Sequence, residues 1–242
     1  MLIQTRGICL HTTEYSETSV IAQVYTEAKG LQSYVISGVR QRRPRVHASL
    51  LQPMSVLELV AYYHPDRTLF RTKEIRSAYN YERIPFELQR SSVCLFAAEV
   101  LLKALRESEA QAELFGFVTD FLLFVDATDA PLANLPAFFL TRLTEYLGFQ
   151  PEAPDFGAPY YFDVLQGYFL PEAPDHERYA DADASAFLVA LMRADVREVA
   201  AIPATRYVRN AAVTSLLEYL RTQMERFQGV TSHRVLAEVL RA

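Results

Sequence analysis

Four arginine side chains gathered in one short segment are the clearest candidates for binding chemistry in this chain. The segment contains no acidic residue and is interrupted by Pro44; its arginines are Arg40, Arg42, Arg43 and Arg45. A guanidinium group presents a planar fork of donors that matches the oxygens of a phosphate. A loop of this composition would contact phosphates without reading bases, and the alternative is a solvated surface loop that has no ligand. Together with Lys29, expected across a hairpin, these arginines form the predicted DNA-binding residues.

Three tyrosines in the same part of the chain offer aromatic faces. They are Tyr34, Tyr62 and Tyr63. Stacking of unpaired bases on such rings is a common way to hold single-stranded nucleic acid. Packing in a core or on the surface of a sheet is the simpler interpretation of the same residues, and the sequence leaves both open.

Signatures of catalysis and of metal binding are absent from the sequence. It has no glycine-rich phosphate loop, no G-x-S-x-G and no H-E-x-x-H, and its five histidines are scattered. Asp181 and Asp183 form a D-x-D near Asp175 and Glu177. We interpret this group as a solvated turn before a helix, because the alternative, a metal-dependent phosphoesterase, would need further carboxylate partners. We therefore predict no enzyme, no catalytic residue, no metal and no cofactor.

Composition places the chain among ordinary globular proteins. Of its 242 residues, 50% are hydrophobic and 22% are charged. No apolar run approaches the roughly 20 residues that would span a bilayer, and the first seven residues lack an apolar signal core. We expect a cytoplasmic protein without membrane contact. The two cysteines, Cys9 and Cys94, lie in apolar surroundings and are predicted to be buried free thiols.

The charge is divided unevenly between the two parts of the chain. The net charge is −5, yet residues 1–80 hold ten basic and six acidic residues, which leaves 14 basic and 23 acidic residues for 81–242. The balances are therefore +4 and −9. An asymmetry of this kind suggests that the two parts bind different partners.

Residues 2–80 have the pattern of a small β-barrel. Short β-branched or alternating runs, separated by turn residues, predict strands near 8–13, 20–25, 31–37 and 50–63, and one or two short strands at 69–78. Within the fourth strand, Pro53 would mark an edge or a bulge. Five strands in about 75 residues match the size of an OB-fold.

Helical periodicity replaces this pattern after a boundary near residues 81–85. Apolar positions predict helices within 86–127, at 132–147, from 182 onward, at 206–227 and at 232–240. The proline-rich stretch 149–181 interrupts them and contains a short hairpin at 160–170. The predicted fold class is therefore α+β multidomain, with an OB-fold β-barrel at 1–80 and an α-helical domain at 81–242 that carries a small β-hairpin insertion.

Several stretches, taken in their order and spacing, resemble the RecO family of bacterial DNA repair and recombination mediators. In the first part they are residues 6–10, 15–19, 25–30, 38–40 and 50–59. In the second part they are Leu147-Gly148-Phe149-Gln150-Pro151, Tyr219-Leu220 and residues 227–230. The resemblance thus covers nearly the whole chain and is strongest in residues 1–80.

This resemblance implies a function and a set of partners. It implies an OB-fold followed by a helical domain, binding of single- and double-stranded DNA without ATP, and annealing of complementary strands. The implied protein partners are RecR, in some cases RecF, and the acidic C-terminal tail of single-stranded DNA-binding protein. The implied outcome is loading of RecA on coated single strands, in the cytoplasm and at the nucleoid.

One departure from the family concerns metal. Many members carry a four-cysteine zinc module after the L-G-F/Y-x-P segment, but residues 149–181 contain no cysteine. We expect a zinc-less hairpin region in its place, held by apolar packing of the side chains of Tyr161, Phe162, Tyr168 and Phe169.

The site for an acidic, apolar tail would be an apolar groove with a basic rim in the second part of the chain. Candidate rim residues are Arg142, Arg206 and Arg209, which are otherwise ordinary helix-surface charges. The alternative function is a protein–protein adaptor, in which the OB-fold binds protein and DNA contact is incidental.

Overall fold

The structure is a computed structural model that describes residues 1–105 and 109–240. Contacts divide the chain into two compact units, each assembled from two stretches of sequence. The barrel unit comprises Met1–Ile84 and Ala98–Asp126, and the helical unit comprises Pro85–Ala97 and Ala127–Ala242. The barrel unit is therefore discontinuous in sequence: its second stretch, Ala98–Asp126, comes after the first stretch of the helical unit.

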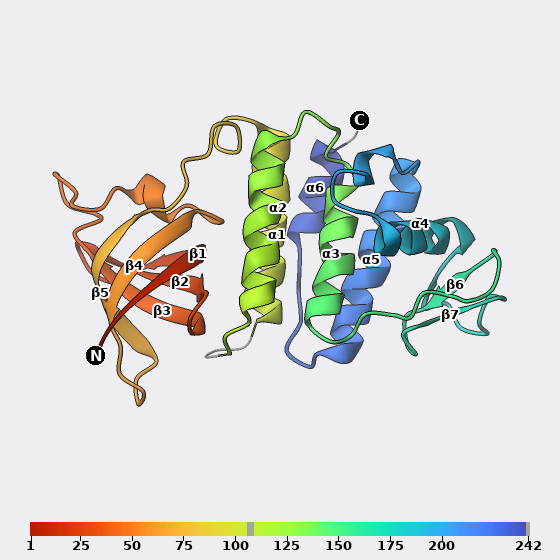
Figure 1. Ribbon diagram of the computed structural model, residues 1–242, viewed down its shortest axis with the longest axis horizontal. Helices are drawn as coiled ribbons and strands as arrows, with labels where there is room; N and C mark the ends of the chain where they lie inside the picture. Colours follow the sequence, from red (N-terminus) through yellow and green to blue (C-terminus); the bar gives the residue numbers. More distant parts are fainter. Residues whose placement is uncertain (106–108, 241–242) are drawn as a thin grey trace. The chain divides into compact units, whose positions relative to one another are not determined.

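Five strands close into a barrel and confirm the predicted OB-type fold (Figure 1). The strand order is β1-β2-β3-β5-β4, in which β3 pairs with β5 in parallel and the other pairs are antiparallel. The strands are β1 (Leu2–Glu14), β2 (Ser19–Thr26), β3 (Gly30–Ser37), β4 (Val56–Tyr62) and β5 (Leu69–Ser77).

Closure of the barrel depends on the long first strand. β1 pairs with β4 through its first half and with β2 through its second half, and its register shifts between Cys9 and His11. A bulge of this kind bends a strand around a barrel. Gly7 lies close to the bend, where an added Cβ would be 2.5 Å from Cγ1 of Val24. The absence of a side chain at this position thus leaves room for the Val24 side chain of β2.

The predicted strand at 50–63 is wrong in its first half. Residues Ala48–Leu51 form a short 3-10 helix (η1), and β4 begins only at Val56. Pro53 has no N–H to give to a ladder. The next residue, Met54, adopts a left-handed backbone with φ of 69°. The chain therefore turns at this point and enters the barrel at Val56.

One helix of the barrel unit covers part of the outer surface of the barrel. Helix α2 (Ala112–Ala127) places the ring of Phe115 5.8 Å from that of Tyr25, and the Arg6 guanidinium lies 5.5 Å from the Phe115 ring. The Tyr25 hydroxyl donates to the carbonyl of Gln111 at 3.0 Å. The preceding helix, α1 (Leu88–Ala104), begins in the helical unit and ends in the barrel unit.

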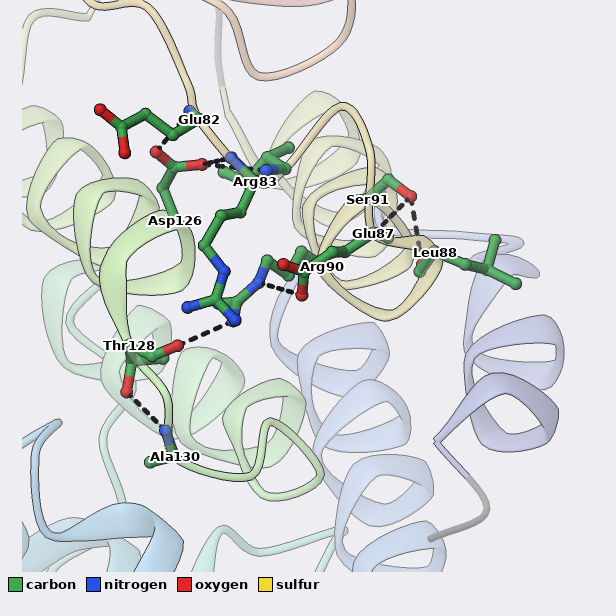
Figure 2. A network of polar contacts seen from close by, with 10 residues as sticks. Glu82, Arg83, Glu87, Leu88, Arg90, Ser91, Asp126, Thr128 and Ala130 are labelled. Atoms are coloured by element: carbon green, nitrogen blue, oxygen red, sulfur yellow. Dashed lines mark hydrogen bonds and ion pairs between the residues drawn. The ribbon is translucent and has the colours of Figure 1, made fainter.

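A buried carboxylate at the end of α2 holds the segment that follows β5 (Figure 2). Asp126 is 2% exposed and accepts hydrogen bonds from the backbone amides of Glu82, Arg83 and Ile84, each at 2.9 Å. Burial alone would raise the pKa of Asp126, but the backbone hydrogen bonds outweigh it and the pKa lies below its usual value. The charged carboxylate is thus the form that fits this segment.

The helical unit contains α3 (Leu135–Tyr146), α4 (Ala182–Arg193), α5 (Arg206–Gln223) and α6 (Ser232–Val239), with a short 3-10 turn, η2 (Val199–Ala201). Helices α3, α4 and α5 pack against one another. Helix α5 ends four residues before the predicted end at 227, because the chain turns there and buries Phe227. Among the described residues, no helix combines the length and the apolar character that crossing a membrane requires.

The stretch 149–181 is held by aromatic packing. Strands β6 (Tyr161–Asp163) and β7 (Tyr168–Leu170) form the predicted hairpin, and β8 (Tyr179–Ala180), which was not predicted, adds a third strand. The ring of Phe162 lies 5.1 Å from Phe169 and 5.3 Å from Tyr219. The expected packing is confirmed for Phe162 and Phe169 and wrong for Tyr168, which is 47% exposed because it alternates outward on β7.

The donors in this stretch do not fit the family's four-thiolate zinc site, because residues 149–181 contain no cysteine. The polar contact found there is between His176 Nε2 and the buried Asp163 carboxylate, at 3.3 Å. Asp163 also accepts the backbone amides of Leu165 and Gln166, which fixes the turn of the hairpin.

Candidate functional site

The arginine-rich segment forms a loop with a fixed base, and we call residues 40–45 the basic loop. The backbone amides of Gly38 and Arg40 donate to the carbonyl of Thr18 at 3.0 and 3.2 Å, and the amide of Arg45 donates to the carbonyl of Gly38 at 3.1 Å. Val39 is buried, and Val46 packs against the barrel core. The loop is therefore anchored at both ends and projects from the barrel between them (Figure 1).

The four arginines of the basic loop differ in their surroundings. Arg40 is ion-paired with Glu14 at 3.0 Å and donates to the carbonyl of Ser16 at 3.1 Å. Arg42, Arg43 and Arg45 are exposed. Within residues 1–105 and 109–240, none of these three forms an ion pair. Three guanidinium groups are thus available to a ligand, and Arg40 is partly neutralised.

Lys29 lies apart from the basic loop. It belongs to the turn that precedes β3, whereas the loop follows β3, and the eight residues of this strand span about 26 Å. The turn and the loop are at opposite ends of β3 in Figure 1. The Lys29 Nζ atom lies 4.9 Å from the centre of the Tyr63 ring. Lys29 and the loop can contact the same DNA only at well separated phosphates.

The three tyrosines divide between packing and exposure. Tyr34 is fully buried, and Tyr63 is half-buried with its ring stacked 5.0 Å from Phe70. Tyr62 is 52% exposed. Opposite Tyr62 on β5 lies Arg71, an exposed residue that the sequence analysis did not single out. Alternation along β5 would have indicated its outward direction but not its partner.

Two of the three candidate rim arginines meet at one pocket of the helical unit. The pocket has a volume of about 310 Å³ and is lined by Arg206 and Arg209 of α5, with apolar side chains that include Val213, Leu236 and Leu240. Arg206 is ion-paired with Glu238 at 2.9 Å, and Arg209 donates to the carbonyl of Ala204 at 2.8 Å. The lining therefore combines basic and apolar side chains, with the Glu238 carboxylate beside Arg206.

Arg142 is not among the residues that line this pocket. Its guanidinium pairs with Glu145 at 2.8 Å and lies 5.7 Å from the Phe138 ring. Arg142 therefore behaves as a paired charge on the surface of α3.

The carboxylate of Asp181 has a local structural role. Asp181 caps α4 by accepting the backbone amide of Ala184 at 2.9 Å, and it also accepts the Tyr207 hydroxyl at 2.8 Å. In the described part of the chain, no group of three or more His, Cys, Asp or Glu side chains is placed to hold a metal ion.

Comparison with known proteins agrees with this architecture. Residues 1–81 match the family model described as Recombination protein O N terminal, and residues 85–231 match Recombination protein O C terminal. The chain is 32% identical over 239 residues to the DNA repair protein RecO of Phocaeicola vulgatus, and 33% identical over 240 residues to that of Bacteroides fragilis, with 99% of each chain covered. The RecO of Porphyromonas gingivalis is 32% identical, with 98% of each chain covered. The chain therefore belongs to the RecO family of DNA repair and recombination proteins.

Proposed function

We propose that this protein is a non-enzymatic recombination mediator that binds single- and double-stranded DNA and anneals complementary strands. With RecR it would help to load RecA on single strands coated by single-stranded DNA-binding protein. RecF is a further candidate partner. This function would place the protein in the cytoplasm, at the nucleoid.

The observation that carries the proposal is the basic loop with its three unpaired arginines. Its base is fixed by the hydrogen bonds to Thr18 and Gly38, so the side chains are presented to solvent at little cost in backbone order. Contacts from Arg42, Arg43 and Arg45 to phosphates would be independent of sequence. These contacts would also be weak and reversible at physiological salt, because salt cations compete with the arginines for the phosphates.

Strand annealing requires a protein that binds phosphates and leaves the bases free. Two complementary strands repel each other through their phosphates, and a protein that neutralises some of these charges lowers that repulsion. A protein that does not read bases leaves them free to pair with the second strand. The arginines of the basic loop would neutralise phosphates, and the loop has no element that would recognise bases.

Contact with the coating protein would be made in the helical unit. The pocket lined by Arg206 and Arg209 would bind the acidic C-terminal tail of single-stranded DNA-binding protein, with the tail's carboxylates paired to the arginines and its apolar side chains against Val213, Leu236 and Leu240. A labelled peptide with this tail sequence should bind the wild type and bind the variant Arg209→Ala more weakly. Arg142→Ala is the matched control, since Arg142 lies outside the pocket, and equal weakening by both variants would contradict the assignment.

Strand annealing tests the main proposal. Two complementary oligonucleotides, one with a fluorophore and one with a quencher, are mixed without ATP, with and without the coating protein. The wild type should accelerate annealing, and a variant with Arg42, Arg43 and Arg45 changed to Gln should lose most of the acceleration. The control variant changes Arg193, Arg197 and Arg221 to Gln, which alters the net charge equally at exposed positions of the helical unit.

The adaptor is the competing function. It predicts that the wild type does not accelerate annealing, or that the triple loop variant anneals as fast as the wild type. Either result would mean that the basic loop does not act in DNA annealing.

A further inference from the structure

A row of outward-facing side chains crosses three neighbouring strands of the barrel. In the strand register, Leu2 of β1 lies opposite Tyr62 of β4, and Tyr62 lies opposite Arg71 of β5. Directly opposed residues on neighbouring antiparallel strands point to the same face, with Cβ atoms about 5 Å apart. The residues next to them in sequence, Ala61 and Phe70, are buried in the barrel. Alternation therefore directs the row away from the core.

Two members of this row are large apolar side chains that are half exposed. Leu2 is 50% exposed and Tyr62 is 52% exposed. Arg71 beside them is exposed and forms no ion pair within residues 1–105 and 109–240. The next arginine on the same strand, Arg76, is ion-paired with Glu58. At Arg71, in contrast, an exposed guanidinium without an ion pair among the described residues lies opposite the exposed ring of Tyr62 on β4.

We infer that Tyr62 and Arg71 form a second nucleic-acid site, one that takes the unpaired bases of a single strand. A nucleobase would stack on the Tyr62 ring, with Leu2 extending the apolar surface, and Arg71 would contact the adjoining phosphate. A duplex hides the faces of its bases in the stack, so it cannot use this site. The site rests on the proposed function and gives it a preference: the basic loop would bind either form of DNA, and the Tyr62 site would bind single strands only.

The distance between the two sites suits one continuous strand. Arg71 is paired with Val35 of β3, three residues before Gly38 at the base of the basic loop. Three residues of extended chain cover about 10 Å, and each step to a neighbouring strand adds about 4.8 Å. A strand that leaves the loop would meet Tyr62 after about 20 Å, within the roughly 4–16 nucleotides that an OB-fold binds.

The charge of the barrel and the exposed Tyr62 ring together favour this occupant. Residues 1–80 carry ten basic and six acidic residues. Arg67, in the turn that follows Tyr62, is a further exposed arginine near the row. A polyanion with flat apolar groups satisfies both the charge and the open ring, and single-stranded nucleic acid has both.

The test compares a fluorescent thymidine oligonucleotide, a duplex of equal length, and a single strand of abasic analogues. Tyr62→Ala should weaken binding of the thymidine strand by about 5- to 150-fold, the loss of one stacked base, and leave duplex and abasic binding unchanged. Tyr62→Phe should bind like the wild type because it keeps the ring. Arg71→Gln should flatten the salt dependence on the single strand by about 0.7 in log–log slope.

Two matched controls accompany these variants. Tyr168→Ala removes a tyrosine of similar exposure from the helical unit, and Arg76→Gln removes an already paired arginine from the same strand. The inference is overturned if Tyr62→Ala binds the thymidine strand like the wild type, or if it weakens duplex and abasic binding equally. If the loop variant loses DNA binding while Tyr62→Ala does not, only this inference fails. If the wild type binds no DNA, the proposed function fails with it.

Discussion

Replacement of Arg42, Arg43 and Arg45 by Gln is the most informative single perturbation of this protein. The three side chains are exposed, and their loop is held by backbone hydrogen bonds at Gly38 and by burial of Val39. Glutamine keeps much of the length and the polar character of arginine but removes the charge. The variant should therefore fold like the wild type, with an unchanged melting temperature, and differ in its contacts with phosphates.

The size of the effect follows from the number of unpaired charges. Each phosphate contact contributes about −0.7 to the log–log slope of affinity against salt for single strands and about −0.9 for duplex DNA. With three contacts, the log–log slope of the wild type should be steeper than that of the variant by about 2 for a single strand and by about 2.7 for a duplex. Between 50 and 200 mM salt, the wild type should lose about 20-fold more affinity for a single strand than the variant does, and about 40-fold more for a duplex.

Fluorescence anisotropy of a labelled oligonucleotide over this salt range measures both slopes. The control has Arg193, Arg197 and Arg221 changed to Gln, which shifts the net charge by the same amount in the helical unit. Equal slopes for the loop variant and the wild type would refute the reasoning. Equal flattening by the control would show that net charge, and not the position of the loop, determines binding.

Three further perturbations have definite expected outcomes. Glu14→Gln releases Arg40 from its ion pair, so it should strengthen single-strand binding and steepen the salt slope by up to about 0.7, measured by the same anisotropy assay; a weaker binding would contradict this. Asp126→Ala leaves three backbone amides without their acceptor and should lower the free energy of unfolding in urea by about 3 kcal/mol. Because the pKa of Asp126 lies below its usual value, its contribution is complete above about pH 4 and is lost as the pH falls further; the wild type should lose this increment on acidification and the variant should not. Burial raises the pKa of the Cys9 thiol to about 12, and Cys94 is also buried, so a thiol reagent at pH 8 should label neither residue until denaturant is added.

Local patterns in the sequence were sufficient for most of the barrel and its surface charges. β-Branched alternation located β2 and β3, and the acid-free run of arginines located the basic loop. The arrangement at 52–56 was not predictable in this way. It depends on the left-handed backbone of Met54, whose amide donates to the carbonyl of Cys9 in another strand, and such a partner is set by the tertiary fold.

Prediction of the site from the sequence was limited for the same reason, because its contacts join residues that are far apart in the chain. The pairing of Arg40 with Glu14 joins residues 26 positions apart, and the opposition of Tyr62 and Arg71 follows from the register of β4 with β5. Neither is visible in one segment of sequence. The separation of Lys29 from the loop could have been foreseen, because a loop that follows an eight-residue strand lies at the end opposite the turn that precedes it.

The discontinuity of the barrel unit sets an order of events during synthesis. All five strands have been made by Ser77, yet Phe115, which covers Tyr25, belongs to the stretch that ends at Asp126. After Ile84, 42 further residues must be added to reach the end of Asp126, which takes roughly 2–8 s at bacterial rates of about 5–20 residues per second. For that interval the Tyr25 side of the nascent barrel is uncovered at the ribosome, where a chaperone that recognises apolar surface could bind it.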